Sequence, residues 1–249
     1  MFSELYVSGI RIKEIEEEAY YKQLPVIRNI IAMEMLEFTS RVTFLVGENG
    51  IGKSTVIEAL AVAMGFNPEG GTRNFAFSTE DSHSGLYNYM TVCRGIKKPL
   101  DGFFLRAESM YNAATYLDNM KDPKATICYG GSLHHKSHGE SFLSVVEHRF
   151  GGKGIYILDE PEAALSPTGL LRLLGDIKAL VDNDSQFIIA THSPILMAFP
   201  GADVIQLSDK GIEHISYKDT EHYIVTKRFM DAPEKILSEV LDLDADITD

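Results

Sequence analysis

The chain has 249 residues, of which 45% are hydrophobic and 24% charged, and its formal net charge is −13. This size and balance predict a globular protein with a sizeable core, while the acidic surplus disfavours tight autonomous binding to nucleic acid, because counterion release needs clustered lysine and arginine. Two cysteines without a partner motif and the absence of a signal-peptide pattern favour a cytoplasmic protein, and no apolar stretch is long enough to predict membrane insertion.

Segments with strand and helix patterns alternate along the chain, which predicts an α/β fold with a mostly parallel central sheet flanked by helices. Residues 5–12 have the period-two pattern of a strand. Residues 27–38 fit either type, and we expect a further strand there that leads into a buried strand at 42–46. The other expected strands are 103–107, 154–158, 186–190, 204–207 and 211–217. One helix is expected to start at Lys53, and the other expected helices span 111–120, 142–150, 170–181 and 194–199.

The chain is organised around residues 42–55, in which an apolar strand runs into the sequence G-E-N-G-I-G-K-S-T. This spacing satisfies the phosphate-loop pattern G-x-x-x-x-G-K-[ST]. A helix follows, so its unpaired N–H groups and positive dipole end favour an anion. Lys53 is expected to reach the β and γ phosphates of a nucleotide, and the Ser54 hydroxyl to bind Mg²⁺. The expected nucleotide contacts are Gly47, Glu48, Asn49, Gly50, Ile51, Gly52, Lys53, Ser54 and Thr55.

Polar groups also follow two later strands. Asp159 and Glu160 come after the apolar run 154–158. Two adjacent carboxylates repel each other unless one binds a cation or the other binds a substrate water. We therefore expect Asp159 to hold Mg²⁺ and Glu160 to polarise the attacking water as a general base. His192 follows the next strand, and there its imidazole is expected to lie near the γ-phosphate and the nucleophilic water.

A second candidate anion cup opens the helix that leads to the Asp159 strand. It consists of Ser137, His138, Gly139 and Glu140, and a serine and a glycine at a helix N-terminus favour an anion. One nucleotide cannot easily use both cups of one molecule. We therefore infer a homodimer in which the Ser137 end of each chain closes over the nucleotide held by Lys53 of the other.

The combined motifs resemble those of the ABC-type ATPases of the P-loop NTPase superfamily. The resemblance is to the branch closest to the SMC and RecF proteins, and especially to a compact bacterial group of predicted ATPases. The motifs are E-N-G-I-G-K-S-T, S-H-G-E, Y-I-L-D-E-P-E-A-A-L-S-P and A-T-H-S-P-I-L-M-A. The resemblance implies ATP bound between two protomers, which close on binding and open after hydrolysis. Carried over by position, it makes residues 47–55 the Walker A loop, Asp159 and Glu160 the Walker B pair, and His192 the switch histidine. Residues 137–140 become the signature that acts in trans.

The sequence departs from the family pattern at several positions. Lys136 and His138 replace the leucine and the first glycine of the usual signature. No glutamine occupies the metal-sensing position, for which Glu108, after the strand 103–107, is the substitute candidate. The resemblance also implies an antiparallel β portion and a helical subdomain. We expect one domain over 1–249, with a core of 1–66 and 151–228, a helical or lid subdomain over about 67–150, and an acidic C-terminal helix and tail over about 229–249.

The motifs predict Mg²⁺-dependent hydrolysis of ATP to ADP and phosphate by a dimer that acts as a mechanical switch for a macromolecular partner. By analogy with the SMC and RecF branch, DNA or a DNA-processing or defence protein is the expected partner. The alternative is the nucleotide-binding subunit of an ABC transporter, which the altered signature disfavours. A small-molecule phosphotransferase would leave residues 137–140 without a role, and a binding module without turnover would not require Glu160.

Overall fold

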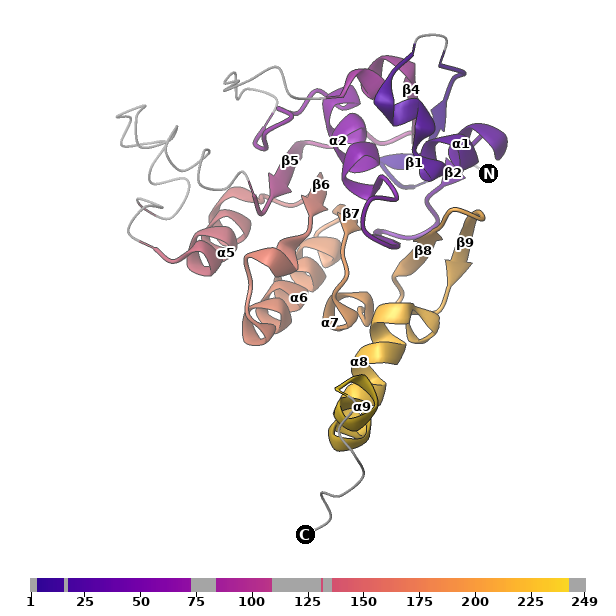
Figure 1. Cartoon of the computed structure of the whole chain (residues 1–249). Helices are drawn as coiled ribbons and strands as arrows, with labels where there is room; N and C mark the ends of the chain where they lie inside the picture. The colour runs from indigo at the N-terminus through magenta and orange to yellow at the C-terminus, as the bar shows by residue number, and fades with distance from the viewer. Residues whose placement is uncertain (1–3, 16–17, 73–83, 109–130, 132–135, 242–249) are drawn as a thin grey trace.

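The structure, a computed structural model, describes residues 4–15, 18–72, 84–108, 131 and 136–241 (Figure 1). Its larger sheet contains, in spatial order, β5 (Asp101–Arg106), β6 (Gly154–Asp159), β7 (Gln186–Ala190), β3 (Val42–Val46), β8 (Asp203–Leu207) and β9 (Ile212–Ile215). The first five strands are parallel and β9 pairs antiparallel with β8. The predicted α/β fold with a mostly parallel sheet is confirmed.

The central strands explain why their sequences are continuous apolar runs. Every residue of β3, β6 and β7 is buried, as expected for parallel strands that are covered on both faces. Asp159 of β6 lies opposite Ala190 of β7, and Ala190 lies opposite Leu45 of β3. This register brings the carboxyl ends of the three strands to one edge of the sheet.

A second, antiparallel sheet is formed near the N-terminus, in agreement with the implied antiparallel β portion. It consists of β2 (Leu36–Glu37), β1 (Val7–Ile12) and β4 (Met90–Arg94). The side chain of Gln186 on β7 accepts a hydrogen bond from the Val7 N–H at 2.9 Å and donates one to the Val7 carbonyl at 2.8 Å. A buried amide therefore joins the two sheets.

The strand predicted over residues 27–38 is wrong for most of its length. Pro25–Ala32 form helix α1, and only Leu36–Glu37 form a strand. Ile27 and Ile30 are fully buried, and a spacing of three residues places them on one face of a helix. The proline at the start of α1 also fits a helix, because its missing N–H lies in the first turn, where no intrahelical acceptor exists.

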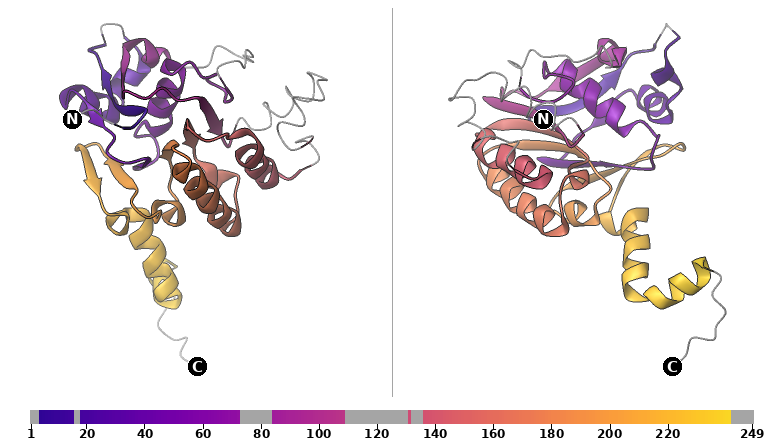
Figure 2. Two further views of the ribbon diagram at one scale, coloured as in Figure 1. Left: turned by 180° about the vertical axis from the view of Figure 1, so that it is seen from behind. Right: turned by 60° about the vertical axis from the view of Figure 1, so that its left-hand side comes forward.

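Helices cover both faces of the larger sheet (Figures 1 and 2). The remaining α-helices of the described residues are α2 (Lys53–Ala63), α5 (His138–Arg149), α6 (Pro167–Asp182), α7 (Pro194–Met197), α8 (Glu221–Asp231) and α9 (Pro233–Val240). One core cluster joins α1, α2 and the smaller sheet, and the other joins α5, α6 and α7. Ile188 of β7 belongs to the first cluster, and Phe187 and Ile189 to the second.

The C-terminal helices project from the body of the molecule, as Figures 1 and 2 show. Neither α8 nor α9 contains a buried residue. Helix α9 occupies the position of the C-terminal helix expected beyond about residue 229, and α8 precedes it from Glu221. None of the helices in the described part of the chain combines the length and apolar character that a bilayer crossing needs.

The stretch 67–150, which we expected to be a helical or lid subdomain, contributes two strands to the core. Met90–Arg94 belong to the smaller sheet and Asp101–Arg106 form an edge of the larger one. The helix expected over 111–120 lies outside the described residues, as does the end of the acidic tail.

Candidate functional site

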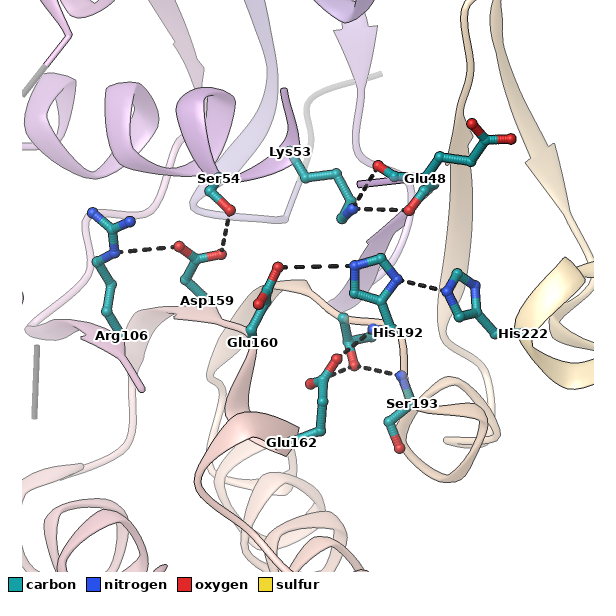
Figure 3. Close-up of polar contacts among 12 residues, drawn as sticks. Glu48, Lys53, Ser54, Arg106, Asp159, Glu160, Glu162, His192, Ser193 and His222 are labelled. Carbon is teal, nitrogen blue, oxygen red and sulfur yellow. Dashed lines mark hydrogen bonds and ion pairs between the residues drawn. The ribbon is translucent and has the colours of Figure 1, made fainter. Parts of the chain in front are cut away.

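The carboxyl ends of β3, β6 and β7 bring together three groups that the sequence predicts to act together (Figure 3). Lys53 and Ser54 start α2, which follows β3. Asp159 ends β6 and Glu160 follows it, and His192 lies two residues beyond the end of β7. These strands are adjacent and parallel, so the side chains meet at the sheet edge where α/β proteins bind ligands.

The loop between β3 and α2 needs glycine because the surrounding protein approaches it closely. Gly47 has a φ of +153°, and an added Cβ would lie 2.2 Å from the carbonyl oxygen of Leu207. Gly52 has a φ of +107°, and its Cβ would lie 2.7 Å from a methyl group of Val26. The neighbouring elements β8 and α1 therefore exclude a side chain at both positions.

Lys53 is a buried cation whose hydrogen-bond partners among the described residues are two carbonyl groups. Its side chain is 4% exposed, and Nζ donates hydrogen bonds to the carbonyl oxygens of Gly47 at 2.8 Å and Glu48 at 3.0 Å. Burial lowers the pKa of Lys53, and the charges of nearby carboxylates, Glu160 first, oppose that shift. Among the described residues, no carboxylate lies within ion-pair distance of Nζ. An anionic ligand would supply the missing counter-charge.

The start of α2 adds further donors for an anion. Gly52 precedes the helix without a side-chain cap, and the first turn contains no acidic residue. The N–H groups of this turn therefore keep their capacity for a ligand. The rest of the predicted nucleotide-contact set lies in the same loop: Glu48, Asn49 and Gly50 are exposed, Ser54 and Thr55 are half-buried, and Ile51 is buried.

Asp159 and Ser54 supply oxygen donors that fit the predicted magnesium site. The Ser54 hydroxyl donates a hydrogen bond to Oδ1 of Asp159 at 3.2 Å. Burial raises the pKa of Asp159 to about 6, the Arg106 guanidinium opposes this shift, and the charge of Glu160 adds to it. Mg²⁺ prefers carboxylate and hydroxyl oxygens, and a nearby dication would stabilise the ionised carboxylate. These two residues would therefore hold the ion.

Arg106 is a site residue that the motif analysis missed. It ends β5, its Nε lies 3.3 Å from Oδ2 of Asp159, and its NH1 group lies 2.9 Å from Oε2 of Glu58. Glu108, the candidate for the metal-sensing position, has a side chain that is 82% exposed and lies 3.9 Å from Arg106. Within the described residues, Arg106 is thus the side chain from β5 that contacts Asp159. Its position at a strand end is the sequence signal that could have identified it.

Glu160 is held in an unusual backbone conformation that turns its side chain towards the site. Its φ and ψ angles are 48° and 55°, a left-handed conformation that costs a non-glycine residue about 1–2 kcal/mol. Its N–H donates to the carbonyl oxygen of Ala190 at 3.0 Å, and Oε1 lies 3.8 Å from Nε2 of His192. The side chain is 37% exposed, so water can reach the carboxylate.

Glu162 is a second residue that the motifs did not identify, and it supports the loop that carries His192. Its carboxylate accepts hydrogen bonds from the Thr191 hydroxyl at 2.8 Å and from the His192 N–H. Thr191 in turn accepts one from the Ser193 N–H at 3.0 Å. Burial raises the pKa of Glu162, and these hydrogen bonds oppose the shift. Glu162 therefore fixes the backbone on which His192 sits.

His192 contacts a second histidine that comes from α8. Its Nδ1 lies 2.7 Å from Nε2 of His222 (Figure 3). Burial, followed by the charges of Lys53 and His222, lowers the pKa of His192 to about 4, so this imidazole is neutral near pH 7. No strand-end rule identifies His222, because it lies on a helix that follows the sheet.

The predicted trans signature forms the N-terminus of α5, a helix that lies apart from α2 in Figure 1. The N–H and hydroxyl of Ser137 donate to Oε2 of Glu140 at 2.9 and 2.8 Å, and Ser137 accepts from the Glu140 N–H at 3.3 Å. Gly139 packs against the segment that precedes α6, since an added Cβ would lie 3.0 Å from the Ala164 carbonyl oxygen. His138 is exposed. A capping box therefore places the chain's own carboxylate at this helix tip.

The assembled groups suit chemistry on a polyphosphate. A buried lysine and a free helix N-terminus bind negative charge, and a hydroxyl with a carboxylate can hold a divalent ion. An accessible carboxylate beside a neutral imidazole can orient a water molecule and accept its proton.

Two family models match the chain, and each covers one part of this site. One, described as an AAA domain, matches residues 27–98, and the other, described as an AAA domain, putative AbiEii toxin, type IV TA system, matches residues 141–198. The first range includes the phosphate loop, and the second includes Asp159, Glu160 and His192. Among curated proteins, none matches this chain.

Solved structures with similar folds include ABC and SMC proteins. CbiO1 of Clostridium perfringens, part of the ABC transporter complex CbiONQ, has 16% identity and a TM-score of 0.48 over 95% of this chain and all of its own. The SMC head domain of Thermotoga maritima has 14% identity and a TM-score of 0.42 over 85% and 99%. An SMC head bound to the C-terminal winged-helix domain of ScpA has 15% identity and a TM-score of 0.44 over 84% and 97%. Both family matches are therefore to AAA domains, and together they span the phosphate loop and the two strand ends that carry Asp159, Glu160 and His192.

Proposed function

We propose that this protein hydrolyses ATP to ADP and phosphate in a Mg²⁺-dependent reaction, as a homodimer that switches between closed and open states. The observation that carries the proposal is Lys53, a buried cation at the uncapped start of α2 whose hydrogen-bond partners in the described part of the chain are two carbonyl groups. It faces Asp159, Glu160 and His192 across the sheet edge (Figure 3). A triphosphate is the ligand class that satisfies all of these groups at once.

Binding follows from the charges of the loop. The phosphates accept hydrogen bonds from the N–H groups of residues 47–55, and Lys53 exchanges its carbonyl partners for phosphate oxygens. Ser54 and Asp159 would hold the magnesium ion, which would neutralise charge on the phosphate oxygens. Asp159 would be ionised in that state, because a bound dication opposes the rise in pKa that burial causes in the free protein.

Hydrolysis is assigned to the two groups beside the phosphates. Glu160 accepts the proton of the attacking water, since its carboxylate is the accessible one of the pair at the end of β6. His192 lies 3.8 Å from that carboxylate and donates a hydrogen bond to the γ-phosphate in the assembled site. A general base of this kind contributes typically about 10²- to 10⁴-fold to the rate.

The dimer accounts for the second helix tip. In the free chain, Glu140 occupies the N-terminus of α5 through the Ser137 capping box. The γ-phosphate of the partner's nucleotide displaces this exposed carboxylate and takes over the N–H groups of α5, which couples ATP binding to closure. The exchange replaces one anion by a more highly charged one at the same dipole end.

The switch is proposed to act on a macromolecular partner in DNA maintenance or in defence. The description of the second matching family, which mentions a toxin of a type IV TA system, favours defence. The net charge of −13 favours a protein partner over direct autonomous binding to DNA.

The test separates binding from hydrolysis. Glu160→Gln keeps the shape of the site and removes the base, so ATP affinity should stay within about threefold while phosphate release falls by about 10²- to 10⁴-fold. Glu213→Gln, the same change at an exposed position on β9, is the matched control and should keep the parent rate. Parent-rate hydrolysis by Glu160→Gln would show that another group is the base.

A further inference from the structure

The pair His192 and His222 must share one proton. Nδ1 of His192 and Nε2 of His222 are 2.7 Å apart, with the ring centroids 4.5 Å apart and the planes tilted by 57°. At this separation a hydrogen lies between the two nitrogens, and when both rings are neutral only one nitrogen carries it. Donation by His192 leaves its Nε2 bare, whereas donation by His222 puts a hydrogen on Nε2 of His192.

The surroundings of Nε2 select between these tautomers. In the described part of the chain this atom is buried and has no hydrogen-bond partner, and it faces Oε1 of Glu160 at 3.8 Å. A bare nitrogen would direct its lone pair at a carboxylate, whereas an N–H directs its positive end there. The tautomer with a hydrogen on Nε2 of His192 has the lower electrostatic energy, so the hydrogen between the two rings belongs to Nε2 of His222.

The neutral state of His192 is consistent with the depth of the site. Burial lowers the pKa of His192, and the neighbouring Lys53 ammonium lowers it further. A doubly protonated His192 is therefore excluded near pH 7, and a hydrogen on Nε2 requires a bare Nδ1. His222 is the residue that can donate to it.

We propose that His222 is a positioning residue, whose Nε2–H donates to Nδ1 of His192 and holds His192 in the tautomer with its hydrogen on Nε2. This inference rests on the proposed function, in which that N–H bonds the γ-phosphate. The second nitrogen of a functional histidine is commonly fixed by such a neighbour. Here the neighbour comes from α8, across a pocket of about 320 Å³ that Glu48 and Asn49 of the phosphate loop line on the other side.

The tautomer can be measured in the nucleotide-free protein. Long-range ¹H–¹⁵N correlation spectra of protein labelled in its eight histidines distinguish protonated from bare ring nitrogens, and His192→Gln assigns the His192 signals by their loss. We expect a protonated Nε2 and a bare Nδ1 for His192. His222→Phe should shift both nitrogens towards averaged values. His222→Gln, whose amide N–H can donate from a similar position, should restore the parent pattern.

A second readout tests the consequence for turnover. His222→Phe should lower kcat by about 10- to 100-fold with KM for ATP unchanged, and His222→Gln should recover most of the loss. His214→Phe makes the same change on β9, where His214 contacts Asp203 and is 47% exposed, and it should change neither the spectrum of His192 nor kcat.

Three results would overturn the proposal: a protonated Nδ1 on His192 in the parent protein, a His192 spectrum that His222→Phe leaves unchanged, or a kcat that His222→Gln fails to recover. The spectra need no ATP turnover. A protein that binds no ATP yet shows the expected tautomer would therefore refute the proposed function and leave the His222 contact intact.

Discussion

Replacing Arg106 by methionine should destabilise the nucleotide-free protein, because two carboxylates depend on this guanidinium. Arg106 lies 3.3 Å from Asp159 and 2.9 Å from Glu58. The side chains of these acids are 5% and 14% exposed, and that of Arg106 is 21% exposed. Methionine keeps much of the volume and removes the charge, so the two acids lose their shared counter-ion.

The size of the effect follows from burial. Removing one partner of a buried ion pair typically costs about 3–5 kcal/mol, because it leaves an uncompensated charge. Arg106 is partly exposed and Asp159 can take up a proton, so the lower end applies, about 3 kcal/mol. For a chain of 150–250 residues each kcal/mol lowers Tm by about 2–4 °C, which gives a decrease of about 6–12 °C.

Thermal unfolding followed by far-ultraviolet circular dichroism measures this decrease, since the chain contains no tryptophan. The matched control is Arg172→Met. Arg172 pairs with Glu147, and its side chain is 55% exposed, so an exposed pair of this kind contributes at most about 1 kcal/mol. A Tm for Arg106→Met that equals that of Arg172→Met would refute the assigned role of Arg106.

Two further changes test other parts of the account. Burial opposes ionisation of Asp101, but the Gly151 N–H and Arg149 hold its pKa below the usual value. Asp101→Asn should therefore lower the free energy of unfolding by about 1–3 kcal/mol at neutral pH. The difference in unfolding free energy between parent and variant is fully present above the unfolded-state pKa of about 3.9, and it is lost as the pH falls through the lower folded-state pKa. Urea titrations at neutral pH and below the folded-state pKa measure this difference. An equal difference at the two pH values would contradict the assigned role of Asp101. Ser137→Arg, made in the Glu160→Gln background, should leave ATP binding by the monomer intact and prevent dimerisation. Size-exclusion chromatography with ATP measures this, and a dimer of unchanged stability would rule out the α5 tip as the trans contact.

Most of the sheet could be predicted because burial on both faces leaves continuous apolar runs. The strands at 42–46, 154–158 and 186–190 follow from that rule. Residues 27–38 could not be assigned in the same way, because a short apolar run fits a strand and a helix equally well. Ile27 and Ile30 pack together in the core, which stabilises residues 25–32 as a helix.

The site residues that could be predicted from the sequence are motif residues at or just beyond the end of a strand. Lys53, Asp159 and His192 stand at or just beyond the ends of neighbouring strands, so topology alone brings them together. Arg106 stands at a strand end too, but it matches no motif. His222 reaches the site through the tertiary placement of α8, which the pattern of that helix does not encode.

The most direct measurement of the central claim is isothermal titration of the purified chain with ATP and Mg²⁺, in parallel with Lys53→Ala. Lys53 is 4% exposed and donates to two carbonyl groups, so we expect one ATP per chain for the parent and no detectable binding for the variant. Circular dichroism should show the same fold for both. Binding of equal affinity by Lys53→Ala, or the absence of binding by the parent, would contradict the account.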